Sequence, residues 1–198
     1  MKARKLHRVI GIILLLPFFG WAVTGFVFFI KPGYAGAYEV LAPKTYPLTG
    51  ALPITPDSTW LEFRYLRTVL GDHLLARSSS GWQNLNPTDQ QPRPMPNESD
   101  LTLLVKDAVS ANPARYGNIS RVSGTTVSTD RGVRITIDWD RMSLQQAGKD
   151  TDRIDLLYRI HYLQWTGIKG VDKIVGFTGL VLLMALTSLG AWLAFKRN

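Results

Sequence analysis

The stretch VIGIILLLPFFGWAVTGFVFFI occupies residues 9–30 and contains no charged side chain. A second uncharged stretch, IVGFTGLVLLMALTSLGAWLAF, occupies residues 174–195. Each has 22 residues. An α-helix of that length is about 33 Å long, and the hydrocarbon core of a bilayer is about 30 Å thick. Both stretches are therefore predicted to cross a membrane as helices.

A cleavable signal peptide is the other interpretation of the first stretch. The small residues Ala35, Gly36 and Ala37 that follow it would suit a cleavage site. However, the apolar core of a signal peptide has about 7–15 residues, and residues 9–30 exceed that length. We therefore expect the first stretch to remain in the protein as a transmembrane helix.

Basic residues flank the two stretches unevenly. Four lysines and arginines precede residue 9, and two more follow residue 195. Such an excess marks the cytoplasmic side of a membrane protein. We expect a protein of the bacterial inner membrane, with both termini in the cytoplasm and the central domain in the periplasm. The cytoplasmic set is Lys2, Arg4, Lys5, Arg8, Lys196 and Arg197, and the opposite set is Lys31, Lys169 and Lys173.

This topology divides the chain into six parts, one of them an amphipathic segment before the second span. That segment has an apolar stripe with helical spacing, and its aromatic residues suit a membrane interface. The stripe consists of Ile154, Leu157, Tyr158, His161 and Trp165. The parts are the N-terminus (1–8), transmembrane helix 1 (9–30), the periplasmic domain (31–151), the interfacial helix and turn (152–170), transmembrane helix 2 (171–195) and the C-terminus (196–198).

Composition excludes several classes of function. The net charge of +8 reflects in part the basic residues beside the two spans, so it does not indicate nucleic-acid binding. The chain has no cysteine, which excludes disulfides, thiolate metal sites, iron–sulfur clusters and a cysteine nucleophile. The two spans contain no ionisable side chain, whereas ion and proton pathways normally require one at depth. We therefore do not expect a transporter.

The central domain has the pattern of a small α+β fold. Apolar alternation predicts strands, and Gly71-Asp72 and Asp130-Arg131-Gly132 predict turns between them. Asp100 is the predicted N-cap of a covering helix that ends near Ala111. The fold class is thus a membrane protein in which two transmembrane helices flank a periplasmic domain of antiparallel strands with a covering helix. The predicted strands are residues 60–68, 73–78, 81–85, 119–129 and 133–140.

Several motifs at the two ends of the chain resemble the PepSY-associated transmembrane family. The first helix carries Arg4-Lys5-Leu6-His7-Arg8, then Trp21 and Thr24-Gly25. The C-terminal part carries Ile160-His161-Tyr162, Gly179-Leu180 and Ser188-Leu189-Gly190-Ala191-Trp192. The resemblance implies a PepSY-like central domain in a small, two-helix member. Where the family has an Asp-Ala-x-Thr-Gly turn, this chain has Leu85-Asn86-Pro87-Thr88-Asp89.

The resemblance also implies a function and a cofactor. Larger, four-span members carry haem and reduce iron in ferric-siderophore uptake, and His7 and His161 match histidines of their helix motifs. We therefore expect haem b with His7 and His161 as iron ligands, one near each face of the membrane. A bis-histidine haem would need a second chain, either in a homodimer or from a partner membrane protein. The further expected partners are the lipid bilayer and a periplasmic ferric siderophore or redox protein.

Other interpretations remain for the same residues. His7 and His161 would also suit interfacial positions where their polar tips reach lipid headgroups. The central domain would also suit a non-catalytic, membrane-tethered module that docks on a partner protein. We expect His73 to be exposed or half-buried beside its turn. The acidic residues from Asp130 to Asp155 alternate with arginines, which predicts a salt-bridged surface and no metal site.

Overall fold

A computed structural model describes residues 2–49 and 54–196. These residues form two compact units, which we describe separately. The two ends of the chain, up to residue 34 and from residue 151, make one unit. The other unit consists of residues 35–150. We call the first the helical unit and the second the domain.

The helical unit is built on two long helices, α1 (Lys2–Ile30) and α6 (Lys169–Phe195). Both are long and apolar enough to cross a membrane. They expose large apolar side chains, which is unfavourable in water: Phe29 and Phe195 are 86% and 85% exposed. The two predicted spans therefore lie within single helices, and most of the apolar surface of these helices lacks protein cover.

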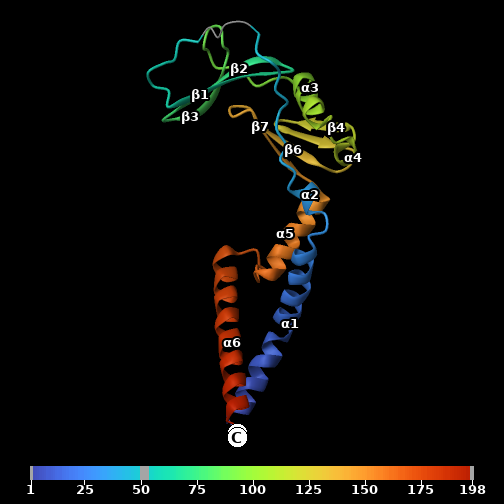
Figure 1. The fold of residues 1–198 in the computed structure, drawn as a ribbon, viewed down its shortest axis with the longest axis vertical. Coiled ribbons are helices and arrows are strands. Elements are labelled where there is room, and N and C mark those ends of the chain that lie inside the picture. Colours follow the sequence, from blue (N-terminus) through green and yellow to red (C-terminus); the bar gives the residue numbers. More distant parts are fainter. Residues whose placement is uncertain (1, 50–53, 197–198) are drawn as a thin grey trace. The chain divides into compact units, whose positions relative to one another are not determined.

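Residues at every third or fourth position of α1 form a stripe that is less exposed than the rest of the helix surface. Along this stripe the most buried side chains are Ile10, Leu14 and Thr24. α6 packs near the start of α1, where Leu186 meets Gly11 and His7 meets Gly190. Figure 1 shows the two helices converging at this end and separating toward the other. The stripe consists of His7, Ile10, Leu14, Pro17, Trp21, Thr24 and Phe28.

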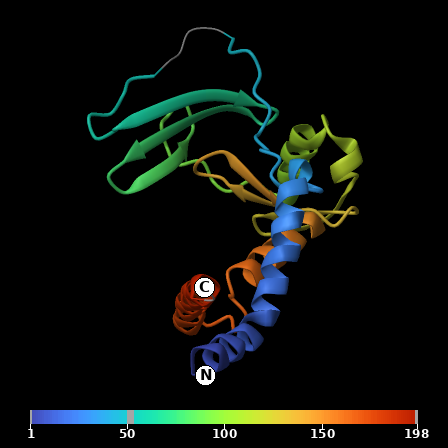
Figure 2. The same cartoon turned by 60° about the horizontal axis from the view of Figure 1, so that its bottom comes forward.

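A shorter helix, α5 (Lys149–His161), precedes α6. Its C-terminal part lies between the separated ends of α1 and α6 (Figures 1 and 2). α5 ends at His161, so Trp165, which the sequence places on the same helical stripe, lies in the following turn and is 48% exposed.

The domain contains two antiparallel sheets. The strand order in the first is β1-β2-β3, and in the second it is β4-β5-β6-β7. Within each sheet, every strand pairs with its neighbour in sequence, so each sheet is a meander. The α+β class with antiparallel strands is therefore confirmed. The strands are β1 (Glu62–Thr68), β2 (Gly71–Ser78), β3 (Gly81–Leu85), β4 (Ile119–Ser123), β5 (Thr126–Thr129), β6 (Arg134–Asp138) and β7 (Ser143–Ala147).

Helix α3 (Glu98–Val109) covers the second sheet, with Leu101 and Val105 against Val127 and Ile135. On its other side Leu104 packs with Leu75, Trp139 and Met142, which joins the helix to the first sheet. The N-cap is Asn97, whose side chain accepts a hydrogen bond from the backbone N–H of Asp100. The prediction of Asp100 as the cap was wrong by one turn. Two short helices, α2 (Tyr34–Ala37) and α4 (Pro113–Tyr116), complete the fold.

Two further predictions, one of a strand and one of a turn, were wrong in detail, and one strand was missed. Residues 119–129 form the hairpin β4–β5 and not one strand, because Gly124 adopts a φ of 56° at the turn. The first turn consists of residues 69 and 70, so that Gly71 and Asp72 already pair with β1. Strand β7 was not predicted.

Candidate functional site

The last turn of α5 and the residues after it contact both long helices at glycines. Ile160 packs on Gly20 of α1, and the carbonyl of Tyr162 lies beside Gly176 of α6. A methyl group on Gly179 would lie 2.9 Å from Leu163 Cδ1, which is too close for a real side chain. Small residues on both helices are therefore what allow this segment to fit between them.

His161 is attached to α1 through two hydrogen bonds. The indole Nε1 of Trp21 donates to the carbonyl of His161 at 2.6 Å. The hydroxyl of Thr24 lies 2.8 Å from His161 Nδ1, and it lies 2.6 Å from the carbonyl of Gly20. A hydroxyl has one proton, which Thr24 donates to the carbonyl because a carbonyl oxygen only accepts. We therefore assign the imidazole proton to Nδ1, which donates to Thr24.

This assignment leaves His161 Nε2 with its lone pair. Nε2 makes no hydrogen bond within the described part of the chain. A metal-bound histidine usually has this arrangement, in which the second ring nitrogen donates to a neighbouring oxygen that fixes the tautomer and the ring orientation. His161 is therefore a residue of this site that could donate a nitrogen lone pair to a metal ion.

Aromatic rings surround the imidazole. Phe28 of α1 meets it edge-on at 5.2 Å between ring centroids, and Tyr162 does so at 5.4 Å. Tyr158 stacks on Phe28 at 4.7 Å and on Tyr162 at 6.1 Å. These rings restrict the access of water to one side of His161.

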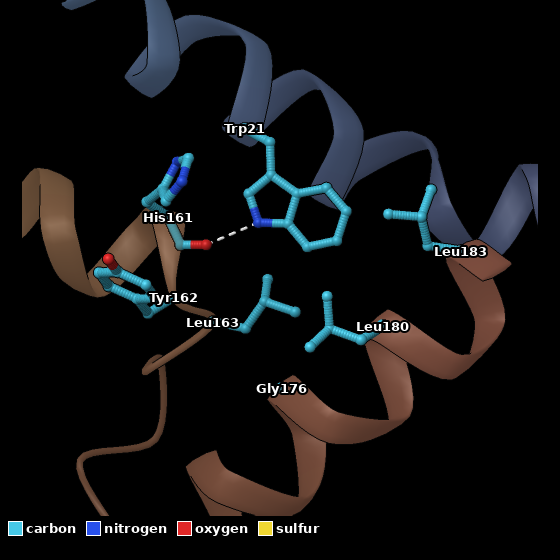
Figure 3. A pocket seen from close by; sticks show the side chains of 7 residues that line it. All are labelled: Trp21, His161, Tyr162, Leu163, Gly176, Leu180 and Leu183. Atoms are coloured by element: carbon cyan, nitrogen blue, oxygen red, sulfur yellow. Dashed lines mark hydrogen bonds between the residues drawn. The ribbon is translucent and has the colours of Figure 1, made fainter. Parts of the chain in front are cut away.

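An apolar cavity of about 480 Å³ lies beside this segment. Figure 3 shows its residues: the imidazole of His161 points toward α1, while leucines surround the indole of Trp21. The imidazole therefore borders the cavity at its edge and does not point into its centre. The lining consists of Trp21, His161, Tyr162, Leu163, Gly176, Leu180 and Leu183.

His7 lies near the opposite end of α1. Seventeen residues separate it from Thr24 along the helix, or about 25 Å. Its Cε1 would lie 3.2 Å from a methyl group on Gly190, and its Nδ1 is buried without a hydrogen-bond partner in the described residues. His7 and His161 are thus at separate positions, and His7 lacks the oxygen partner that His161 has.

His73 is fully buried, so the prediction of an exposed or half-buried position was wrong. Its Nε2 lies 2.9 Å from the hydroxyl of Thr68, and its Nδ1 lies 3.2 Å from both Asn84 Oδ1 and Arg93 Nη1. Burial, with a smaller effect of the Arg93 cation, lowers the pKa of His73 from 6.5 to about 4. His73 is therefore a neutral structural residue.

Acidic side chains do not gather into a metal site. Within residues 2–49 and 54–196, the structure has no group of three or more His, Asp or Glu side chains arranged to hold a metal ion. Asp138 is paired with Arg141, and Asp150 with Arg115. Asp130 accepts the backbone N–H of Asn118.

Sequence reasoning missed two features of this protein. The first is the partnership of Thr24 with His161, although the spacing of Thr24 from His7 and Trp21 on one stripe of α1 was visible. The second is a cluster around Arg115, whose guanidinium donates to Asp150 Oδ2 and to Gln146 Oε1, each at 2.6 Å. No local pattern marks Arg115, because its partners lie more than 30 residues away.

Together, fold and site define a class of protein: an antiparallel α+β domain inserted between two apolar helices of membrane-spanning length. No protein-family model, no curated protein and no solved structure matches this chain.

Proposed function

We propose that this protein is a haem-binding electron-transfer component of the bacterial inner membrane that serves the reduction of siderophore-bound iron in the periplasm. The observation that supports the proposal is the geometry of His161. Its Nδ1 is held by Thr24, its Nε2 keeps a free lone pair, and aromatic rings cover one side. The resemblance of the His7 and His161 segments to helix motifs of PepSY-associated transmembrane proteins points to the same cofactor.

Each residue has a defined part in this proposal. A haem bound here would carry one electron at a time, and the protein would set its orientation and potential. His161 would hold the haem iron through Nε2, and Thr24 would orient the ring by accepting a hydrogen bond from Nδ1–H. Phe28 and Tyr162 keep water from one side of the imidazole.

A second histidine ligand would come from outside the chain. His7 is about 25 Å away along α1 and cannot reach a metal bound to His161. We therefore propose a homodimer, or a complex with a partner membrane protein, in which a second histidine completes the site. In the same arrangement His7 would serve a second haem near the other face of the membrane.

The test is an absorbance spectrum of the detergent-purified protein, oxidised and reduced with dithionite, after haem has been supplied during expression. We expect the spectrum of a six-coordinate, low-spin b-type haem. His161→Ala should remove most of it, His7→Ala should remove a separate part, and Tyr162→Phe, which keeps the ring, should change little. A wild-type protein that remains colourless contradicts the proposal.

A second candidate function is a membrane-tethered binding module, and one observation in the domain favours it. A cavity of about 740 Å³ is bordered by Leu70, Arg93, Met95, Leu103 and Trp139. Met95 and Leu103 are 43% and 46% exposed, as residues at a docking surface would be. The two functions require different residues. Leu103→Asp should abolish partner binding and leave a haem spectrum intact, whereas His161→Ala should do the reverse.

A further inference from the structure

The apolar cavity beside Trp21 adjoins a second, charged cavity. The second has a volume of about 650 Å³, and the two share Tyr162 and Gly176 in their linings. We call the two adjoining cavities together the slot, with the charged cavity as its mouth and the apolar cavity as its interior. The charged residues of the mouth are Arg159, Lys169, Asp172 and Lys173.

The mouth carries an excess of positive charge. Arg159, Lys169 and Lys173 form no ion pair in the part of the chain that the structure describes. The carboxylate of Asp172 is already engaged, because its Oδ1 accepts the backbone N–H of Thr166 at 2.9 Å and the Thr166 hydroxyl at 2.7 Å.

Two neighbouring features define the electrostatics of the mouth further. The N-cap of α6, Ile168, provides no side-chain hydrogen bond to the first turn, and the acidic residue in that turn is Asp172. Asp155, one turn before Arg159 on α5, borders a neighbouring polar cavity. The mouth therefore suits a single anionic group.

The slot runs along α6 from charged to apolar surroundings. Lys169 at the mouth and Leu183 at the far end are 14 residues apart, or about 21 Å along a helix. If α6 crosses a bilayer, Lys169 and Lys173 lie at the level of the headgroups, and Leu180 and Leu183 lie at the level of the acyl chains. A bilayer phospholipid has its charge and its apolar part at the same two depths.

We propose that the slot binds one anionic glycerophospholipid from the bilayer. Arg159, Lys169 and Lys173 bind its phosphate, and one acyl chain lies against Trp21, Leu180 and Leu183. The lipid fills the space that α5 opens between the two long helices, and it thereby stabilises their separation. This proposal rests on the membrane-spanning role of α1 and α6 and does not require haem.

The first experiment tests the charge at the mouth. The full-length, haem-free protein is purified in detergent, mixed with phosphatidylglycerol or with zwitterionic phosphatidylcholine, and examined by native mass spectrometry. We expect one phosphatidylglycerol to be retained per chain, in clear preference to phosphatidylcholine. Arg159→Gln/Lys173→Gln should lower the phosphatidylglycerol affinity about 30-fold, since each basic side chain near an anionic surface contributes a factor of about five.

Control variants separate this site from general surface charge. Lys31→Gln removes a basic side chain at the domain-side end of α1, outside both cavities, and should leave phosphatidylglycerol retention unchanged. Inorganic phosphate should not displace the lipid, because a free phosphate gains nothing from the apolar slot. Displacement by phosphate would reduce the site to an anion site and overturn the proposal, as would equal retention by the wild type and the double variant.

The second experiment tests the apolar part. Leu180→Trp places a larger side chain into the slot and keeps every charge, so lipid retention should fall at least tenfold. Val181→Trp makes the same change at the next residue, which does not line the slot. The two positions are similarly exposed, at 56% and 47%, so both variants should fold alike. Unchanged retention in Leu180→Trp would contradict the proposed position of the acyl chain.

Discussion

The side chains of Thr24 and His161 meet at 2.8 Å between Oγ1 and Nδ1, although 137 residues separate them in the chain. The whole domain is inserted between these two residues. Their contact joins α5, the helix that follows the domain, to α1, the helix that precedes it. It also sets the tautomer of the histidine that we propose as a haem ligand.

The first prediction concerns the hydroxyl of Thr24. Thr24→Val keeps the shape of the side chain and removes the acceptor for His161 Nδ1. The imidazole then loses the partner that orients it, and loss of such a partner typically costs 10–100-fold in metal affinity. We expect haem to dissociate from Thr24→Val about 10–100 times more readily, as measured by transfer of haem to an excess of apomyoglobin.

Thr24→Ser is the matched control, because it keeps the hydroxyl and removes only a methyl group. It should retain haem nearly as well as the wild type and should show the same reduced spectrum. Equal haem transfer from Thr24→Val and Thr24→Ser would mean that the hydroxyl has no part in positioning the ligand.

The sequence predicts the helical unit better than the domain, for a physical reason. The uncharged stretches around Trp21 and Leu180 are long enough to specify helices without any tertiary contact. In β7, by contrast, Leu144 is the one core residue of the polar stretch SLQQA, so the strand has no apolar alternation. The sequence does not predict the hairpin at Gly124, because β-compatible residues continue on both sides of the glycine.

The candidate site shows the same division. His161 was visible as a histidine beside a predicted span, but its partner Thr24 is known only from the packing of α5 on α1. His73 was misjudged because its burial depends on Asn84 and Arg93, which come from later segments of the chain. Polar residues become buried when distant partners satisfy them, and one local pattern does not reveal those partners.

The second prediction concerns the dependence of domain stability on pH. In the folded protein the pKa of His73 is about 4, against 6.5 for an exposed histidine. As the pH falls below 6.5, His73 binds a proton in the unfolded chain but stays neutral in the folded domain, so stability is lost between pH 6.5 and 4. We expect the free energy of unfolding to fall by about 3 kcal/mol between pH 7 and pH 4 through this group.

The measurement is urea denaturation of the full-length protein in detergent, followed by tryptophan fluorescence. The indole of Trp139 meets the His73 ring edge-on at 5.4 Å and should report the unfolding of this region. His73→Gln lowers stability at neutral pH but has no titrating group, so its stability should change much less between pH 6.5 and 4. A pH profile that is as steep in His73→Gln as in the wild type would assign the effect to other groups.

The third prediction concerns the cluster around Arg115, which holds together the first and last segments of the domain. The Arg115 side chain is 12% exposed and pairs with Asp150 at 2.6 Å, while its Nε lies 3.7 Å from Glu39. Gln146 donates from Nε2 to the carbonyls of Gly36, Ala37 and Glu39, each at 3.1 Å. The residues that follow α1 are thus tied to those that precede α5.

Arg115→Ala would leave two carboxylates in a half-buried position without their cation. Removing one partner of a fully buried pair costs about 3–5 kcal/mol, and exposed pairs contribute about 0–1 kcal/mol. Because Glu39 and Asp150 are 28% and 29% exposed, we expect an intermediate loss of stability, about 2 kcal/mol in urea denaturation.

Two control variants test this explanation. Arg141→Ala breaks the pair between Arg141 and Asp138, whose side chains are 63% and 42% exposed, and should cost no more than about 0.5 kcal/mol. Arg115→Lys keeps the charge but loses the planar fork that reaches Asp150 and Gln146 together, so its stability should fall between that of the wild type and that of Arg115→Ala. If Arg115→Ala were no less stable than Arg141→Ala, the cluster would be a surface ion pair and would not hold the two segments together.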